Sequence, residues 1–380
     1  KWEIVKLASV CEINPSKKEI SEISEDREAS FIEMSSVSNE WYIIFSENRK
    51  IKDLKKRWFT YFREDDIILA KITPCMENGK CAIAKHLMNG IWFWSSEFHV
   101  FWCQKTKILP EYLFSLLNQE KIRKIAETNM TGTSGHRRVP IEFYEKLDIP
   151  LPPLDIQEQI VREMEEVEKR EMEMKKRIEK QRWDIAELMR SVNGKDEKLE
   201  NIAVLLKRGK SAKYGDSRIQ IIKSGQARWL KEFDFRERHF IEQWSILDER
   251  KLQRWDILIN STGVGTAWRV TLFDLEGDFV VDTHVTILRV DRSKTLPDFV
   301  LQSLTKIGFK NIEAMATGQS GQIELSLGII WNIKIPLPPL SEQQRIVTEI
   351  EKIEDEISRL ESELTTIPSQ KEFILKKYLA

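Results

Sequence analysis

The chain has 380 residues, of which 41% are hydrophobic and 32% charged, and its formal net charge is −1. This length suits two or three domains, each large enough to bury a core of its own. No apolar run approaches the roughly 18 residues of a membrane span and no signal peptide is recognisable, so we expect a cytoplasmic protein that does not bind membranes. Four cysteines without a C-x-x-C pair favour neither a metal site nor a disulfide framework.

The first globular domain is predicted at residues 1–153. Short apolar runs rich in aromatic and β-branched residues predict strands, and an Asn-Gly pair predicts a turn. The elements expected in chain order are strands at 66–71, 91–94 and 98–102 with the turn at 78–79, a helix at 109–117 and a polar loop at 131–138.

A proline segment, Ile149-Pro-Leu-Pro-Pro-Leu154, closes this domain and cannot be helical. Asp155 is placed as the N-cap of a long, charged and amphipathic helix at 154–194. The same arrangement returns 186 residues later (335 − 149), where Ile335-Pro-Leu-Pro-Pro-Leu340 is followed by Ser341 and a helix at 340–380. The chain is therefore predicted to be a globular domain followed by a long helix, repeated once.

The second globular domain, predicted at 195–339, repeats the order of the first. Its matching segments are Asp256–Asn260 for the strand at 66, Asp282–Val285 for Ser96–Val100, Leu296–Val300 for the helix at 109 and Thr317–Gln322 for the loop at 131. Between these segments the two copies differ widely. This pattern indicates one scaffold that carries two different surfaces.

Both helices show apolar residues at alternating steps of four and three, which predicts a coiled-coil seam. The predicted seam consists of Ile160, Met164, Val167, Met174, Ile178, Ile185 and Leu188 in the first helix, and of Ile346, Ile350, Ile353, Ile357, Leu360 and Leu364 in the second. Three polar residues also fall on it, Glu171, Gln181 and Lys371, and could fix the register or meet a partner helix. Pro368 should interrupt the second helix.

The two helices are predicted to pair with each other, because the rest of the chain lacks enough matching heptads. Each leads away from its own globular domain, so an antiparallel pairing would hold the two domains at opposite ends of a rod. The fold class is α/β (α+β), with two repeated globular domains separated by an antiparallel coiled coil.

The charge distribution is uneven. Residues 154–194 hold 9 Lys and Arg against 11 Asp and Glu, and residues 341–380 hold 6 against 9, which gives 15 − 20 = −5. The remainder of the chain therefore carries −1 + 5 = +4, so the globular parts are mildly basic.

Several motifs resemble the specificity subunits of type I restriction–modification systems. They are the two P-L-P-P-L segments with Gln157-Glu-Gln159 and Glu342-Gln-Gln344, the segment Ile72–Lys80, the segment Ser96–Val100 and the Thr-Gly-x-Ser-Gly loops at 131–135 and 317–321. The resemblance spans both repeats. In the second copy Ser261–Thr266 replaces the Ile72-Thr-Pro-Cys segment, so contacts cannot be copied from one domain to the other.

The resemblance implies two target recognition domains, each reading one half of a split site in double-stranded DNA. It implies a coiled coil that sets the half-site spacing and docks two methyltransferase (modification) subunits, with restriction subunits joining through the complex. It also implies a chain without catalytic activity or cofactors. S-adenosylmethionine, ATP and Mg are expected only on partner subunits.

Candidate DNA-contacting residues lie in the loops that follow the predicted strands and precede the proline segments. In the first domain they are Lys71, Thr73, Asn78, Lys80, Thr133, Ser134, His136, Arg137 and Arg138; in the second they are Asn260, Ser261, Thr262, Gln319, Ser320 and Gln322. Guanidinium groups and hydroxyls suit phosphates and base edges, and glutamine can pair with adenine. Alternatively, these loops only connect each domain to its helix.

Other patterns favour structural roles. Gly263-Val-Gly265 lacks a P-loop lysine and indicates a tight turn more than a cofactor site. Trp92, Trp94 and Trp102 lie in strand-like runs and suit core packing more than base stacking. His99 and His284 are assigned equivalent positions and buried structural roles.

Two rival functions use the same architecture. One is a non-enzymatic coiled-coil scaffold whose two globular domains bind proteins, which the lack of a strongly basic stripe favours. The other is a self-contained methyltransferase, for which the chain offers no methyl-donor motif.

Overall fold

The computed structural model describes residues 2–16, 18, 23–32, 47–54, 60–85, 91–94, 96–133, 135–242, 248–263, 265–313 and 324–379. It divides into two compact units: unit 1 comprises Lys1–Met174 and Glu363–Ala380, and unit 2 comprises Lys175–Ser362. Each unit contains a globular part of strands and short helices together with segments of two long helical stretches. The mixed fold class is confirmed, whereas the predicted boundaries at 153, 194 and 339 stay a prediction.

Two four-stranded sheets form the globular part of unit 1. In the first sheet all pairings are antiparallel, and its strand β6 is buried at every residue. Its order is β2 (Cys11–Ile13), β9 (Phe98–Cys103), β6 (Ile67–Ala70) and β7 (Cys81–Ile83). The second sheet has the order β4 (Glu47–Lys50), β3 (Glu28–Ile32), β8 (Ile91–Trp94) and β5 (Thr60–Arg63).

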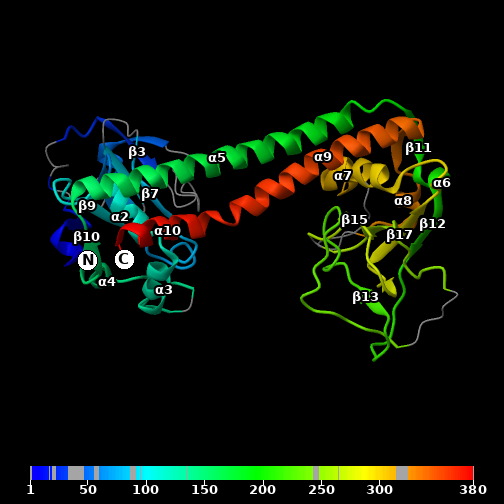
Figure 1. Ribbon diagram of the computed structural model, residues 1–380, viewed down its shortest axis with the longest axis horizontal. Helices are drawn as coiled ribbons and strands as arrows, with labels where there is room; N and C mark the ends of the chain where they lie inside the picture. The colour runs from blue at the N-terminus through cyan, green and yellow to red at the C-terminus, as the bar shows by residue number, and fades with distance from the viewer. Residues whose placement is uncertain are drawn as a thin grey trace. The chain divides into compact units, whose positions relative to one another are not determined.

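Short helices and one further strand pair complete unit 1. The helices are η1 (Leu7–Ser9), α1 (Ile51–Leu54), α2 (Pro110–Leu117), α3 (Glu120–Thr128) and α4 (Ile141–Glu145). Strands β1 (Glu3–Lys6) and β10 (Asp148–Leu151) pair antiparallel, so the proline segment is the second strand of this pair. The two ends of the chain lie close together (Figure 1), where the Trp2 indole donates to the Tyr378 carbonyl at 2.5 Å.

Unit 2 repeats the first of these sheets. Its four-stranded sheet has the order β12 (Ala203–Arg208), β17 (Val285–Val290), β14 (Ile257–Asn260) and β15 (Val270–Leu272). Its other strands are β13 (Gln220–Ile222) with β16 (Phe279–Val281), and β11 (Lys195–Lys198) with β18 (Lys334–Leu337). Its short helices are α6 (Leu199–Ile202), α7 (Pro297–Glu313) and α8 (Leu327–Trp331). The matching strand order bears out the internal repeat.

The repeated proline–helix motif is explained by one buried glutamine in each copy. Gln157 accepts a hydrogen bond from the Leu109 amide at 2.8 Å and donates to the Lys107 and Pro152 carbonyls at 2.9 and 2.8 Å. Both this residue and Gln343 are 0% exposed. Each glutamine therefore fastens the first turn of a long helix to the loop that precedes a shorter one, α2 or α7.

In the second copy Gln343 forms the equivalent hydrogen bonds. Gln343 accepts from the Leu296 amide at 2.9 Å and donates to the Pro338 carbonyl at 2.8 Å and the Lys294 carbonyl at 3.2 Å. Buried main-chain amides and carbonyls need hydrogen-bond partners, and the two glutamine side chains provide these partners for the loops.

The helical stretches are α5 (Leu154–Arg190), α9 (Leu340–Leu364) and α10 (Ile367–Leu379). As expected, the second stretch breaks just before Pro368, which lies in the first turn of α10. In unit 1, Lys377 forms an ion pair with Glu163 at 2.6 Å and Lys371 forms one with Glu171 at 3.0 Å. Later residues of α10 therefore meet earlier residues of α5, so the two helices are antiparallel.

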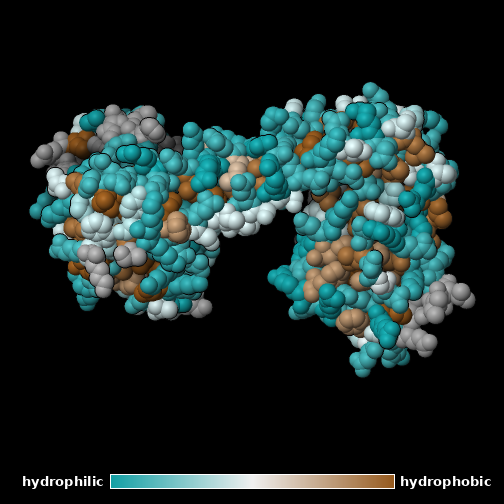
Figure 2. Space-filling view, in the orientation of Figure 1, coloured by the Kyte–Doolittle hydropathy of each residue, from teal (hydrophilic) through white to brown (hydrophobic). Residues whose placement is uncertain are grey.

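The remaining part of α5 pairs with α9 in unit 2. Arg182 forms an ion pair with Glu361 at 2.7 Å, and Met189 packs in one hydrophobic cluster with Ile346 and Ile350. Later residues of α5 therefore meet earlier residues of α9, which is again antiparallel. The exposed surface of these helices is largely hydrophilic (Figure 2).

The residues predicted for the seam are buried or half-buried in every case. Two of its polar residues meet each other, because the Lys371 ammonium lies 3.0 Å from Glu171 and 3.6 Å from Glu168. Burial raises the pKa of Glu168, and the nearby Lys371 opposes this rise. The third, Gln181, keeps its Oε1 atom buried without a partner in the described part of the chain.

No helix within the described ranges combines the length and the apolar character that a membrane crossing requires.

Candidate nucleic-acid interface

In unit 1, three segments from separate parts of the chain meet at the end of strand β6. The Lys71 amide donates to the Glu97 carbonyl at 3.0 Å, and the Val139 amide donates to the Lys71 carbonyl at 2.9 Å. Ile72 and Arg138 form an isolated antiparallel bridge. We call Lys71, Ile72, Glu97 and Arg138 the first junction. It brings together the two loops that the sequence singled out separately.

The side chains of the first junction form an ion pair close to the Lys71 ammonium. Arg138 donates to both Glu97 carboxylate oxygens, at 2.8 and 2.7 Å, and lowers the pKa of Glu97. No described side chain accepts a hydrogen bond from the half-buried Lys71 ammonium. Burial lowers the pKa of Lys71; the Glu97 carboxylate raises it and the Arg138 charge lowers it further.

His99 supports this junction from inside. Its Nε2 lies 2.9 Å from the Val139 carbonyl and its Nδ1 lies 3.0 Å from Asn14 Nδ2, so a neutral ring that donates from Nε2 satisfies both contacts. Burial lowers the pKa of His99 to about 4, which keeps the ring neutral at neutral pH. The structural role predicted for His99 is confirmed.

The other candidate residues of unit 1 lie in the same two loops as the first junction. The Thr73 amide donates to the Arg137 carbonyl at 3.0 Å, and the Arg137 guanidinium donates to the Glu127 carbonyl at 3.0 Å. Asn78, Thr133 and His136 are exposed, and Lys80 is half-buried. Ser134 lies outside the described residues.

Unit 2 builds the same backbone arrangement at the end of strand β14. The Ser261 amide donates to the His284 carbonyl, and the Leu325 amide donates to the Ser261 carbonyl, both at 2.8 Å. Thr262 bridges to Glu324 as Ile72 does to Arg138. We call Ser261, Thr262, His284 and Glu324 the second junction.

The side chains of the second junction differ in kind. The Thr262 hydroxyl lies 2.5 Å from His284 Nδ1, and Glu324 pairs with Arg208 at 2.7 Å. Ser261 and Asn260 are both 0% exposed, so neither side chain reaches the surface in this conformation and both serve as supports. Gln319, Ser320 and Gln322 lie outside the described residues.

The equivalence assumed between His99 and His284 is wrong. His99 lies opposite Leu69, whereas the residue opposite the corresponding Ile259 is Thr286. His284 takes the place of Glu97 instead and is exposed, not buried as expected. The sequence match was displaced because both copies carry a histidine before a buried valine, although the two histidines lie two positions apart along equivalent strands.

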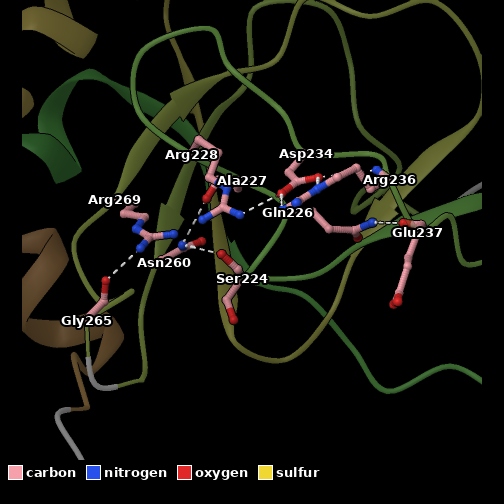
Figure 3. Close-up of polar contacts among 10 residues, drawn as sticks. All are labelled: Ser224, Gln226, Ala227, Arg228, Asp234, Arg236, Glu237, Asn260, Gly265 and Arg269. Atoms are coloured by element: carbon pink, nitrogen blue, oxygen red, sulfur yellow. Dashed lines mark hydrogen bonds and ion pairs between the residues drawn. The ribbon is translucent and has the colours of Figure 1, made fainter. Parts of the chain in front are cut away.

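A cluster of arginines in unit 2 was missed by the sequence reasoning (Figure 3). It consists of Arg228, Arg236 and Arg269 with Asp234 and Asn260, and we call it the arginine cluster. Arg228 donates to Asp234 at 2.7 Å, and Arg236 donates to both oxygens of the same carboxylate at 2.9 and 2.6 Å. The sequence feature that could have revealed it is a local concentration of basic residues, because residues 223–239 contain five Lys and Arg.

The glycines at 263 and 265 form the tight turn that leads from β14 toward the arginine cluster. Their φ angles are 108° and 74°, a region that side-chain-bearing residues rarely adopt. The Gly265 carbonyl accepts a hydrogen bond from Arg269 at 2.9 Å. The geometry agrees with the turn predicted there.

Comparison with known proteins gives the family. The model of the type I restriction modification DNA specificity domain matches residues 1–181 and 247–367. The EcoAI and EcoEI type I restriction enzyme specificity subunits of Escherichia coli are 40% identical over 161 residues and 34% over 160. Each match covers 42% of this chain, but only 27% and 26% of those relatives, so the chain matches about a quarter of their length.

Solved structures support the fold. A chain from work on complex assembly and conformational transition of the type I R-M system superimposes with a TM-score of 0.62 at 19% identity, covering 99% of this chain and 97% of that one. The type I restriction-modification S subunit from M. genitalium gives 0.55 at 15% identity, covering 100% and 96%. The chain belongs to the family of type I restriction modification DNA specificity domains.

Proposed function

We propose that this chain is the DNA sequence-specificity subunit of a type I restriction–modification complex, and that its two globular parts are target recognition domains. Each would read one half of a bipartite site in double-stranded DNA. The observation that carries the proposal is the pair of junctions: two copies of one backbone arrangement present different side chains at the same places. Two half-sites of different sequence require such a difference.

The residues proposed to meet DNA in the first domain belong to the first junction or to the loop beside it. Arg137, Arg138, His136 and Lys71 offer donors suited to phosphates and base edges, and they come from two loops held by main-chain bonds. Rigid main-chain support of this kind favours recognition, because little loop entropy is then lost on binding.

The paired helices are proposed to set the distance between the half-sites and to dock two methyltransferase subunits. Restriction subunits would join through that complex. The chain itself is proposed to be non-catalytic and to hold no cofactor, while S-adenosylmethionine, ATP and Mg act on the partner subunits. A cytoplasmic location follows from this proposal, since the complex must reach chromosomal DNA.

Co-expression with the methyltransferase subunit, followed by methylome sequencing, tests the function. We expect methylation at one bipartite motif. Exchanging one globular part for that of another specificity subunit should change only the half-site that this part reads. Co-purification without any sequence-dependent methylation would favour the rival function of a protein-binding scaffold instead.

The spacer is tested by changing helix length. Deletion of one heptad from α5 and the matching heptad from α9 should shorten the unspecified spacer and leave both half-sites unchanged, because a heptad preserves the seam. Methylation at an unaltered spacer would contradict the proposed role of the helices in setting distance.

A further inference from the structure

The arginine cluster holds more positive charge than its own carboxylate can balance. Arg228 and Arg236 both pair with Asp234, whereas Arg269 forms its hydrogen bond with the Gly265 carbonyl. The three guanidinium groups and one carboxylate leave a surplus of 3 − 1 = 2 charges, and the Glu237 carboxylate points away from the cluster (Figure 3). Burial lowers the pKa of Arg269, and the charge of Arg228 lowers it further. Like charges held near one another in a partly buried place are unfavourable unless an anion joins them.

Two buried polar atoms in the cluster have no partner within the described ranges. Arg269 uses Nη2 for the Gly265 carbonyl, while its Nη1 is unpaired. Asn260 is 0% exposed and donates to the Ser224 carbonyl at 2.7 Å, which fixes the amide orientation and leaves its Oδ1 unpaired. Buried groups without partners are rare and point to a bound water or ligand. Arg269 Nη1 is a donor and suits an anion, whereas Asn260 Oδ1 is an acceptor and suits a water molecule.

The backbone beneath the cluster is rigid. Arg269 directly precedes strand β15, and the Arg228 carbonyl accepts from the Thr271 hydroxyl of that strand at 2.6 Å. The Arg228 amide bonds the Glu232 carbonyl at 3.1 Å, and the Asp234 amide bonds the Gln226 carbonyl at 2.9 Å. The guanidinium groups are therefore positioned before any ligand arrives.

Building on the proposed function, we propose that Arg228 and Arg269 together bind one phosphodiester group of the DNA backbone. Guanidinium groups match phosphate oxygens in geometry and charge. Asp234 holds Arg228 in place, and Arg236, whose side chain is 86% exposed, extends the positive surface toward the solvent. The pair thus sets the position of the second domain on the duplex and reads no base.

The experiment measures DNA affinity of the full chain, assembled with its methyltransferase subunits, against salt concentration. Two duplexes of equal length are used: one carries the motif found by methylome sequencing and the other lacks it. The variants are Arg228→Gln, Arg269→Gln and the double variant. Arg254→Gln is the matched control, because Arg254 is an exposed arginine of the same unit that pairs with a single carboxylate, Asp274.

Each single variant should lower the slope of log affinity against log salt by about 0.9 and weaken binding about eightfold at 0.1 M salt, equally on both duplexes. Because the two arginines share one phosphate, the double variant should lower the slope by about 0.9 as well, not by twice that value. Arg269→Lys, which keeps the charge, should restore most of the slope. Melting temperatures confirm that each variant is folded.

Three results would overturn the inference. A slope unchanged relative to Arg254→Gln would make the cluster an internal ion network. A loss confined to the cognate duplex, with altered base preference, would make it a base-reading site. A double variant with twice the slope change would place the arginines on separate phosphates. Failure of the wild-type complex to prefer its motif would instead contradict the proposed function, while the phosphate contact remains measurable on the second duplex.

Discussion

The two junctions show the same main-chain bonds around opposite chemistry. Arg138 in the first is replaced by Glu324 in the second, and the acidic Glu97 is replaced by His284. The first presents a cationic edge with a spare ammonium, whereas the second is neutral to acidic and its nearest arginine, Arg208, is bound to Glu324. The fold thus fixes where a side chain stands and leaves its charge free to vary.

A second pair of equivalent positions shows how far the divergence extends into the core. Asp66 accepts from the Arg63 amide at 2.7 Å and from the Trp102 indole at 2.5 Å, whereas Asp256 pairs with both nitrogens of the Arg289 fork at 2.7 Å. One copy therefore buries a carboxylate with neutral donors at bonding distance and the other buries an ion pair. The surfaces differ because the supports beneath them differ as well.

The largest effect is expected where the copies agree. Gln157→Ala and Gln343→Ala each leave one amide and two carbonyls buried without partners, and each should lower the free energy of unfolding by roughly 3–4 kcal/mol. Chemical denaturation of the full chain measures the loss, and hydrogen exchange assigns it to unit 1 or unit 2.

Gln159→Ala is the matched control for this prediction, because Gln159 is exposed on the same turn of α5. It should change stability by less than about 0.5 kcal/mol. If only one of the two buried glutamines proves sensitive, the motif has different roles in the two copies and the comparison between them weakens.

The next prediction concerns the pH dependence of stability, which should differ between the two copies. Burial raises the pKa of Asp66 from 3.8 to about 7, so folded unit 1 keeps a proton that the unfolded chain loses between those pH values. The free energy of unfolding should therefore fall as pH rises from about 4 to about 7, by at most about 1.4 kcal/mol per pH unit. Asp66→Asn should remove this slope, measured by hydrogen exchange of strand β6 corrected for intrinsic rates.

Asp256→Asn provides the contrast at pH 8. It leaves the Arg289 guanidinium, whose side chain is 18% exposed, without its carboxylate and should cost roughly 3 kcal/mol. Asp66→Asn should cost little or stabilise at that pH, because the ion pair that it removes is long: Arg63 Nε lies 4.0 Å from the buried Asp66 carboxylate. Equal losses in both variants would show that Asp66 is paired in solution as Asp256 is.

Sequence patterns with a strict period predicted the largest features of this molecule. The heptads located the paired helices and Pro368 located the break, since helix geometry depends on local spacing. The proline segments were predicted only to be non-helical, and the structure shows that they form strands that pair with β1 and β11. Nothing in Pro-Leu-Pro-Pro indicates a partner 140 residues away.

The candidate site was predictable only in part, for the same reason. The loops at 71–80 and 131–138 were each recognisable, yet their contact depends on tertiary hydrogen bonds between Thr73 and Arg137. The arginine cluster joins an irregular segment to the start of a strand, so no motif spacing describes it. The burial of Asn260 and Ser261 could not be predicted from the sequence either, because polar residues at the end of a strand are more often exposed.

The smallest effect tests whether the spare ammonium of the first junction serves binding or the fold. Lys71→Met keeps most of the side-chain length and removes an ammonium group whose pKa burial lowers, so unit 1 should become slightly more stable while DNA affinity falls. Its counterpart change, Ser261→Ala, breaks the bond to Thr286 and should instead lose about 1 kcal/mol. Opposite signs in the two units would show that the first junction keeps a destabilising charge for its ligand; a loss in both would make Lys71 a structural residue and remove it from the interface.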